Sequence, residues 1–356
     1  MYSRTISPPP ESIVRNGTAC FGTFSPVPAR LDIRGIIAPF AGLPLPSIVT
    51  NFRIKSRMKY MFAVGPYIGF VEIFDDKIFG LADVLFWNRD TGKKYFFHRF
   101  MTGRRRFIPI STGVSATTSF RRSRYIRISW NRARNRITLT FNMRGNSSYP
   151  SVSGHLHASF DNPHLKEFVS VTPAPTTSRC SATWIVSTPS HGCITIKKDK
   201  RQPGSTMADS PALSCMVLNR MFYKTHTTRN AACGLGTIDE RAVIFRFANT
   251  TADAVDSDTY NDNLLTVDGD ATLMPPVMIT RPFGGNKNWV VQDTESMVDL
   301  TFTPISINRR LFHIFFFHTV YDAVYGLFNG FLLTRTGEKI VLKDFPGIVT
   351  SNTMRI

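Results

Sequence analysis

The chain has 356 residues, which is long enough for two domains that each bury a hydrophobic core. Hydrophobic residues make up 42%, with 29 Phe, which excludes wholesale disorder, and the abundance of Phe, Val, Ile and Thr favours strands over helices. The formal net charge of +18 is unusual, and a field of that size attracts RNA, anionic lipid headgroups or acidic protein surfaces.

The first half of the chain carries most of this charge. Residues 1–165 contain 24 Lys and Arg against 8 Asp and Glu, whereas residues 166–356 contain 19 against 17. The five cysteines include no C-x-x-C pair, which argues against a disulfide framework and for a reducing compartment. The sequence contains no apolar run of eighteen residues, so we expect no transmembrane helix.

The N-terminal part contains two proline-rich segments. Residues 1–16 predict an extended arm, which we expect to be held against neighbouring subunits. Residues 35–49 are apolar but contain three prolines, so they fit neither a helix nor an inner strand. This second segment is either a loop that covers the core or a contact with an apolar partner or a membrane.

Four strands are predicted next, separated by short polar or glycine-containing turns. They cover residues 58–63, 67–74, 78–87 and 94–100. Short strands with this spacing are typical of a meander or a barrel.

An arginine-rich region follows, with twelve Arg and no Lys, Asp or Glu between Arg99 and Arg144. Apolar residues alternate in 125–130 and 137–141, which predicts a hairpin with arginines at its tip. Arginine favours bidentate contacts with phosphate or carboxylate groups. We therefore predict that an anionic partner outside this chain binds Arg104, Arg105, Arg106, Arg121, Arg122, Arg124, Arg127, Arg132, Arg134 and Arg136.

The identity of this partner is narrowed by the aromatic residues. Nucleic-acid binding usually adds exposed aromatic side chains that stack on bases. The alternation instead places Trp130 and Phe141 in the core, so anionic lipid or acidic protein is favoured over RNA.

A domain boundary is predicted where the content of Pro, Thr and Ala rises, between residues 172 and 178. The predicted organisation is an extended arm at 1–16, an N-terminal basic β domain at 17–170 and a C-terminal β domain at 171–356. The acidic loop 249–270 lacks the glycine and closing glutamate of a calcium site, so it is interpreted as solvated.

Two hairpins are predicted in the last seventy residues. In the first, a strand at Trp289 precedes a second strand in which Val298, Leu300 and Phe302 share one face, and Pro304 ends that strand. In the second, residues 311–318 pair with 325–333 across a polar turn through Asp322. Glycines within these strands predict bends or close backbone approaches.

The C-terminal motifs resemble a known family. They are Val298 to Pro304 after a tryptophan strand, Tyr325-Gly326-x-Phe328-x-Gly330-x-Leu332, and Asp344-x-x-Gly347. Together with Gly17 to Phe24 near the start, they resemble the DUF2804 family, whose function is undefined. The resemblance implies a double lipocalin-like β fold, akin to the two-barrel carotenoid hydratases. Small residues at 218–234 replace the family's tryptophans, which implies a rebuilt or emptied pocket.

Candidate catalytic and metal-binding residues are few. His155 and His157 would share a strand face, as metal ligands sometimes do, but no third ligand has a clear spacing, so neither a metal nor another cofactor is predicted. His313 and His318 have opposite parity and are predicted not to face one pocket. Asp299 is either a general acid within a barrel or an ordinary hydrogen-bonded carboxylate. No hydrolase, phosphate-loop or metalloprotease motif is present.

The sequence thus predicts an all-β fold of two lipocalin-like β-barrel or sandwich domains side by side, with a Pro-rich arm. The favoured function is a non-catalytic subunit of a large mitochondrial complex at the inner membrane. An accessory subunit of a divergent ATP synthase, docked on cardiolipin-like lipid or on other subunits, is the first choice. A mitoribosomal protein that contacts rRNA phosphates is the next choice. A lipocalin-like binder or hydratase of an apolar lipid or isoprenoid is the third hypothesis, so an enzymatic role stays open.

Overall fold

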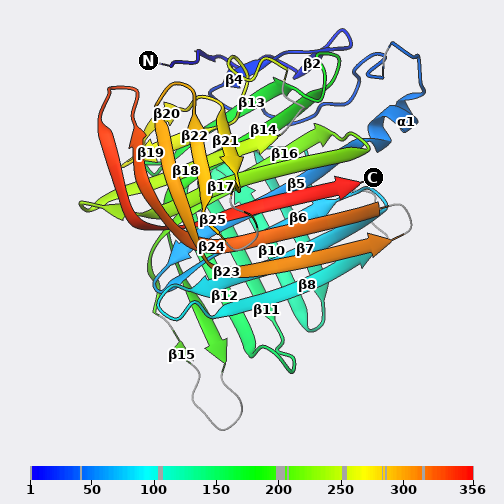
Figure 1. Cartoon of the computed structure of the whole chain (residues 1–356). Coiled ribbons are helices and arrows are strands. Elements are labelled where there is room, and N and C mark those ends of the chain that lie inside the picture. Colours follow the sequence, from blue (N-terminus) through cyan, green and yellow to red (C-terminus); the bar gives the residue numbers. More distant parts are fainter. Residues whose placement is uncertain are drawn as a thin grey trace.

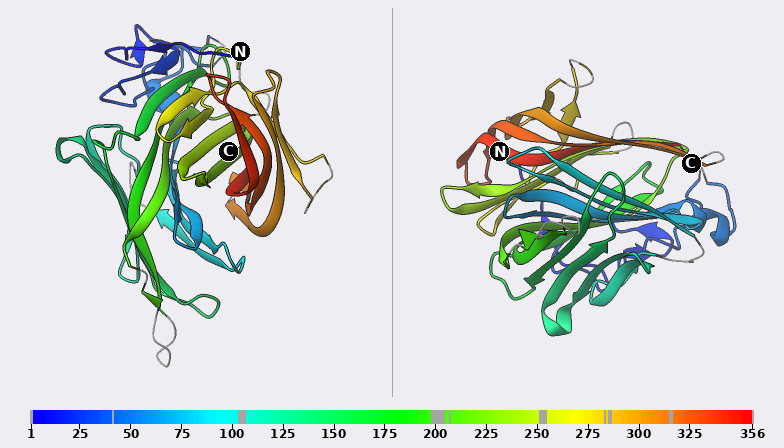
Figure 2. Two further views of the ribbon diagram at one scale, coloured as in Figure 1. Left: turned by 90° about the vertical axis from the view of Figure 1, so that its left-hand side faces the viewer. Right: turned by 90° about the horizontal axis from the view of Figure 1, so that it is seen from below.

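The computed structural model describes residues 2–40, 42–102, 107–197, 205–206, 208–250, 255–282, 284, 287–314 and 317–355. Two large curved sheets contain almost all of the strands, and they lie face to face (Figures 1 and 2). The predicted all-β class is confirmed. No helix in these described ranges is long and apolar enough to span a membrane.

The first sheet has a central path of ten strands and four further short strands. The path runs in the order β8 (Lys94–Thr102), β7 (Phe79–Asn88), β6 (Tyr67–Asp75), β5 (Ile54–Val64), β16 (Ser210–Phe222), β14 (Cys180–Lys197), β12 (Ser151–Ser159), β11 (Arg136–Met143), β10 (Arg124–Asn131) and β9 (Val114–Arg121). The short strands are β1 (Ile6–Ser7), β4 (Gly22–Phe24), β13 (Lys166–Pro173) and β15 (Ser205–Thr206).

The second sheet has nine antiparallel strands. Their order is β20 (Asp270–Leu273), β19 (Leu264–Val267), β18 (Arg241–Thr250), β17 (His226–Ile238), β25 (Lys339–Arg355), β24 (Phe317–Leu333), β23 (Val298–Ile314), β22 (Trp289–Asp293) and β21 (Val277–Thr280). Outside the two sheets lie the hairpin of β2 (Val14–Arg15) and β3 (Thr18–Ala19), the helix α1 (Ser47–Phe52) and the 3-10 turn η1 (Arg132–Arg134).

The chain passes from the first sheet to the second between Phe222 and His226, because β16 pairs within the first sheet and β17 within the second. The predicted boundary at residues 170 and 171 instead falls within β13. The stretch rich in Pro, Thr and Ala is the connection between β13 and β14, which are antiparallel partners. A composition typical of linkers thus marks a hairpin turn here.

The predicted arginine hairpin is confirmed. Ile126 lies opposite Phe141, Ile128 opposite Leu139 and Trp130 opposite Ile137, and all six side chains are buried. Alternation places Arg127 and Arg136 on the other face of the hairpin, and Arg132 and Arg134 lie in its 3-10 turn.

Four apolar clusters lie in the described part of the chain, and three of them account for most of the core. One fills the first sheet around Trp130 and Trp184, and another fills the second sheet around Trp289 and Phe302. The third joins the sheets: Trp87 of β7 stacks on Tyr325 of β24 with ring centroids 6.0 Å apart, and its Nε1 donates to Ser306 Oγ at 3.1 Å. The sheets therefore share a core.

Two details of the C-terminal hairpins differ from the prediction. β23 continues through Pro304, which lies at a register shift against β24, since a bulge tolerates the missing N–H. β23 ends at Ile314 and β24 begins at Phe317, so Asp322 is within β24. Asp322 is buried and paired with Arg309 at 2.8 Å, so its polarity indicates an ion pair and not a turn.

The predicted close backbone approach is confirmed at Gly330, which has a φ of +134° beside a register shift. A Cβ there would lie 2.0 Å from the Asp299 carbonyl oxygen. We expect Gly330→Ala to lower the free energy of unfolding by about 1–3 kcal/mol or more, as measured by urea denaturation. Gly284→Ala, which also has positive φ but open space around it, should cost clearly less, and equal costs would contradict this steric origin.

The N-terminal arm is held by contacts within the chain. Ile6 and Ser7 pair with Thr23 and Phe24 in parallel. Tyr2 donates a hydrogen bond of 2.6 Å to the Asp258 carbonyl oxygen, and Arg4 donates to the carbonyl oxygens of Asn261 and Asn263. These contacts hold the arm against both sheets, and its contact with neighbouring subunits stays a prediction.

Candidate functional site

A line of ionisable side chains crosses four neighbouring strands of the first sheet. In the strand register, Lys59 of β5 is the partner of Glu72 in β6, Glu72 of Asp83 in β7, and Asp83 of His98 in β8. Cross-strand partners lie on the same face of a sheet. Each residue interrupts a mostly apolar strand, and Glu72 and Asp83 are buried.

A matching line crosses the second sheet. Arg310 of β23 is the partner of Tyr321 in β24, Tyr321 of Asn352 in β25, and Asn352 of Arg229 in β17. The two lines meet where the Tyr321 hydroxyl donates to Glu72 Oε2 at 3.0 Å. We call the two lines, together with Arg57, Arg246 and Asp262, the charged seam.

Glu72 is the centre of the seam. Lys59 Nζ lies 3.0 Å from Glu72 Oε2, and Arg57 Nε lies 3.4 Å from Glu72 Oε1. Burial opposes ionisation of Glu72, but these cations outweigh it and lower the pKa of the carboxyl to about 2. Glu72 is therefore ionised at neutral pH.

Asp262 has the same role on the side of the second sheet. Its carboxylate lies 2.9 Å from Arg246 Nη1 and 3.3 Å from Arg229 Nη2. The two arginines lower the pKa of Asp262 to about 2, against the effect of burial. Burial lowers the pKa of Arg229, whose ion pair is the longer of the two.

At the other end of the seam, Asp83 receives contacts from both sheets. His98 Nδ1 lies 2.5 Å from Asp83 Oδ1, and Arg310 Nη1 donates to Asp83 Oδ2. The side chain of His98 is 28% exposed, so this end reaches solvent.

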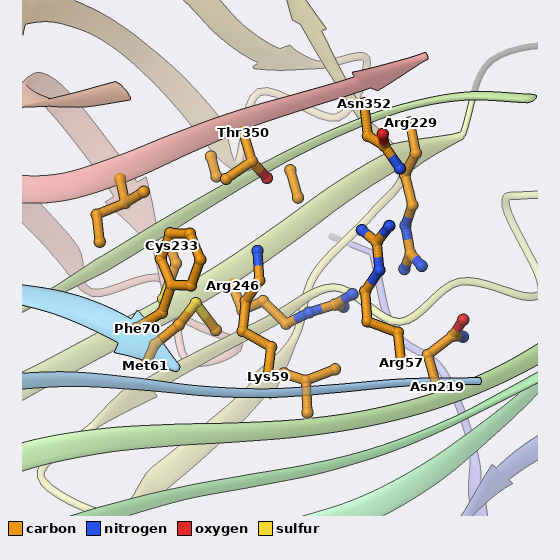
Figure 3. Close-up of a pocket in the computed structure, with 14 residues that line it drawn as sticks. Arg57, Lys59, Met61, Phe70, Asn219, Arg229, Cys233, Arg246, Thr350 and Asn352 are labelled. Atoms are coloured by element: carbon orange, nitrogen blue, oxygen red, sulfur yellow. The ribbon is translucent and has the colours of Figure 1, made fainter. Parts of the chain in front are cut away.

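A cavity of about 50 Å³ lies between the sheets beside Glu72 and Asp262 (Figure 3). Arg57, Lys59, Arg229 and Arg246 form its polar part, and Met61, Phe70, Val217, Ala232, Cys233 and Ile348 form much of its apolar wall. Arg57 and Arg229 come from opposite sheets, and their guanidinium groups approach each other. Asn219 Oδ1, also in the wall, has no hydrogen-bond partner among the described residues.

The charges of the seam do not balance. Among the described residues it contains five cations other than histidine, which are Arg57, Lys59, Arg229, Arg246 and Arg310, and three carboxylates, which are Glu72, Asp83 and Asp262. An uncompensated charge away from water costs several kcal/mol. The arrangement therefore favours an anion in the cavity.

The predicted arginine site divides into several groups. Arg104, Arg105 and Arg106 lie outside the described residues. Arg132 is used within the chain, since it forms a bidentate pair with Glu167 at 2.7 and 2.6 Å, and Arg124 donates to the His98 carbonyl oxygen at 3.0 Å. Five arginines are exposed, namely Arg121, Arg122, Arg127, Arg134 and Arg136.

The histidine and aspartate candidates are also placed. His313 and His318 are cross-strand partners with ring centroids 5.7 Å apart, so the prediction from parity is wrong, because they lie on different strands. His155 and His157 share a face with His191, but no group of three or more His, Cys, Asp or Glu in the described ranges could hold a metal ion. Asp299 is exposed and accepts a hydrogen bond from Gln292.

The model of the family described as "Domain of unknown function (DUF2804)" matches residues 43–355. The chain belongs to the DUF2804 family. Two solved structures are similar to it: kievitone hydratase from Nectria haematococca and an AttH-type protein from Nitrosomonas europaea. The first has 6% identity and a TM-score of 0.44, and covers 85% of this chain and 88% of its own. The second has 10% identity and a TM-score of 0.39, with 86% and 93% covered.

At this identity and TM-score, neither structure indicates an activity for this chain. No curated protein matches the sequence. The charged seam of this DUF2804 chain was missed at the level of sequence. Its signal is an ionisable residue between apolar neighbours inside a strand, as at Glu72 and Asp83. Such residues are rarely buried without a partner, so each one points to a contact that the sequence does not identify.

Proposed function

We propose that this DUF2804 protein binds a small anion, or the anionic group of a small molecule, between its two sheets. The excess of two cations around a buried cavity supports this function. Carboxylate and phosphate are the complementary groups, because guanidinium forks bind both in bidentate fashion. The carboxylates of Glu72 and Asp262 form ion pairs with these cations and hold their side chains in position.

The size of the cavity restricts the ligand. About 50 Å³ holds a few water molecules or one small oxyanion, since a water needs about 10–15 Å³ on this measure. An isoprenoid is too large for this cavity. The hypothesis of a lipocalin-like binder or hydratase is therefore restricted to the binding of a small anionic group beside an apolar wall. We assign no reaction.

The test uses inorganic phosphate and acetate as probes. We expect millimolar phosphate or acetate to raise the melting temperature at constant ionic strength, because a ligand that binds only the folded state stabilises it. Arg229→Met should abolish this response. It should not lower the stability of the anion-free protein, since Asp262 keeps Arg246 and one excess cation is removed.

The matched control is Arg241→Met, which removes an exposed arginine paired with Glu338. This variant should keep the anion response. A wild-type melting temperature that is indifferent to both anions, or an Arg229→Met variant that responds like wild type, would exclude the proposed site.

A second candidate function is docking on a polyanionic surface through the arginine hairpin. Arg127, Arg134 and Arg136 line one depression of about 540 Å³ on the outer face, together with Tyr125 and Thr140. No side-chain ion pair is recorded for these three arginines within the described chain. An acidic protein or an anionic lipid complements this face.

Membership of a mitochondrial complex, with an ATP synthase or a mitoribosome as the assembly, stays a prediction. Purification of the native protein in mild detergent should bring down its partner subunits in stoichiometric amounts. Replacing Arg127, Arg134 and Arg136 with Ser should release them without loss of fold. Stoichiometric rRNA would exclude the ATP synthase, and a monomeric native protein would exclude both assemblies.

A further inference from the structure

An uncharged apolar segment lies on the outside of the first sheet. Residues 35–52 contain no charged residue, and Arg30, Arg34 and Arg53 flank them. Six of the sixteen exposed large hydrophobic side chains in the described chain lie in this segment. They are Ile37, Leu43, Leu45, Ile48, Val49 and Phe52, with exposures of 73%, 58%, 42%, 79%, 47% and 40%.

The local structure explains this exposure. Prolines at 39, 44 and 46 prevent the segment from joining a sheet, and α1 begins directly after Pro46. In α1 only Thr50 is buried, so Ile48, Val49 and Phe52 remain open to solvent. Figure 1 shows α1 at an outer edge of the molecule. Concentrated apolar exposure of this kind marks an interaction surface.

Basic side chains line a groove beside this surface. A groove of about 580 Å³ beside α1 is lined by Phe40, Leu45 and Val49 and by Arg53, Arg179, Lys224 and His226. Arg179 lies over the Phe40 ring at 5.1 Å. The sequence contains no Asp or Glu from residue 33 to residue 71, and the side chains that line this groove include four basic residues and no acidic one.

We propose that residues 37–40 and 42–52 form a membrane-binding surface that inserts its apolar side chains into the interface of an anionic bilayer. Insertion to the boundary between headgroups and acyl chains removes Ile37, Ile48 and Phe52 from water. The basic side chains of the groove then face the anionic headgroups. Charge complementarity and the proline-stiffened apolar tip favour a bilayer over a folded protein partner. This surface is distinct from the charged seam and from the arginine hairpin. The membrane proposal is therefore independent of both proposed functions.

The test is sedimentation of the full-length protein with vesicles. Vesicles of phosphatidylcholine and phosphatidylserine in equal parts should bind the protein, vesicles of phosphatidylcholine alone should bind it much more weakly, and salt should weaken binding. The double variant Ile37→Ser with Ile48→Ser should lower the partition coefficient about tenfold or more, since it removes two large inserting side chains. Circular dichroism and the melting temperature establish that this surface variant is folded.

The matched control is Val341→Ser, because Val341 is 60% exposed and lies in β25 of the second sheet. It should bind vesicles like wild type. Equal binding of wild type and the double variant would overturn the proposal, and so would equal binding to both kinds of vesicle. If wild type instead forms a dimer in solution that the double variant loses, while vesicles recruit neither, a second copy covers this surface and the membrane proposal is wrong.

Discussion

Replacing Glu72 with glutamine is expected to lower the free energy of unfolding by about 3–5 kcal/mol, as measured by urea denaturation. The substitution keeps the volume of the side chain but leaves Arg57 and Lys59 without their carboxylate in a buried environment. The seam already contains more cations than carboxylates, so no other buried anion can compensate. Glu338→Gln is the control, because the pair of Glu338 with Arg241 is exposed and should contribute little.

The same residue predicts a pH dependence. The pKa of Glu72 is about 2 in the folded protein and about 4.5 when unperturbed. The stabilisation from its ionised form is complete above the unfolded value and is lost as the pH falls from about 4.5 through about 2. Glu72→Gln should therefore show a weaker dependence of unfolding free energy on pH in this window. An unchanged dependence would mean that other carboxylates account for the acid sensitivity.

Replacing Trp184 with alanine is expected to lower the free energy of unfolding by about 3–5 kcal/mol, since it opens a large cavity in the first core. The Trp184 ring is fully buried and packs edge-on against Trp130, with centroids 5.5 Å apart. Its Nε1 donates to Glu167 Oε2 at 3.1 Å, and Glu167 in turn pairs with Arg132.

Trp184→Phe separates packing from the hydrogen bond. It keeps most of the apolar volume and should cost about 1–2 kcal/mol, because Glu167 keeps its pair with Arg132. Both variants should be measured by urea denaturation with an unchanged m value. A cost below 1 kcal/mol for Trp184→Ala would contradict the central position of this ring.

The sequence determined the strands and their buried faces wherever one face of the strand is exposed to solvent. Ile126, Ile128 and Trp130 alternate with polar residues, and only one register buries all three. The same pattern located Trp289, Leu300 and Phe302 in the second core. Local spacing is sufficient there because a shift by one residue would expose the whole apolar face.

Local spacing failed where a residue has a distant partner. Asp322 was interpreted as a turn residue, but its ion pair with Arg309 allows it within β24. The Pro, Thr and Ala content near residue 174 suggested a linker, although β13 and β14 pair across it. His313 and His318 lie opposite each other because β23 and β24 pair as antiparallel strands.

Only the tertiary structure decided which cations are compensated and which are not. The sequence shows twelve arginines between Arg99 and Arg144, but it does not show that Arg132 is paired with Glu167. Nor does it show that Arg57 and Arg229, which are 172 positions apart, meet beside one cavity. The order of apolar and polar residues along a strand determines which face is buried. The electrostatic environment of a buried charge depends instead on which strands the fold brings opposite it.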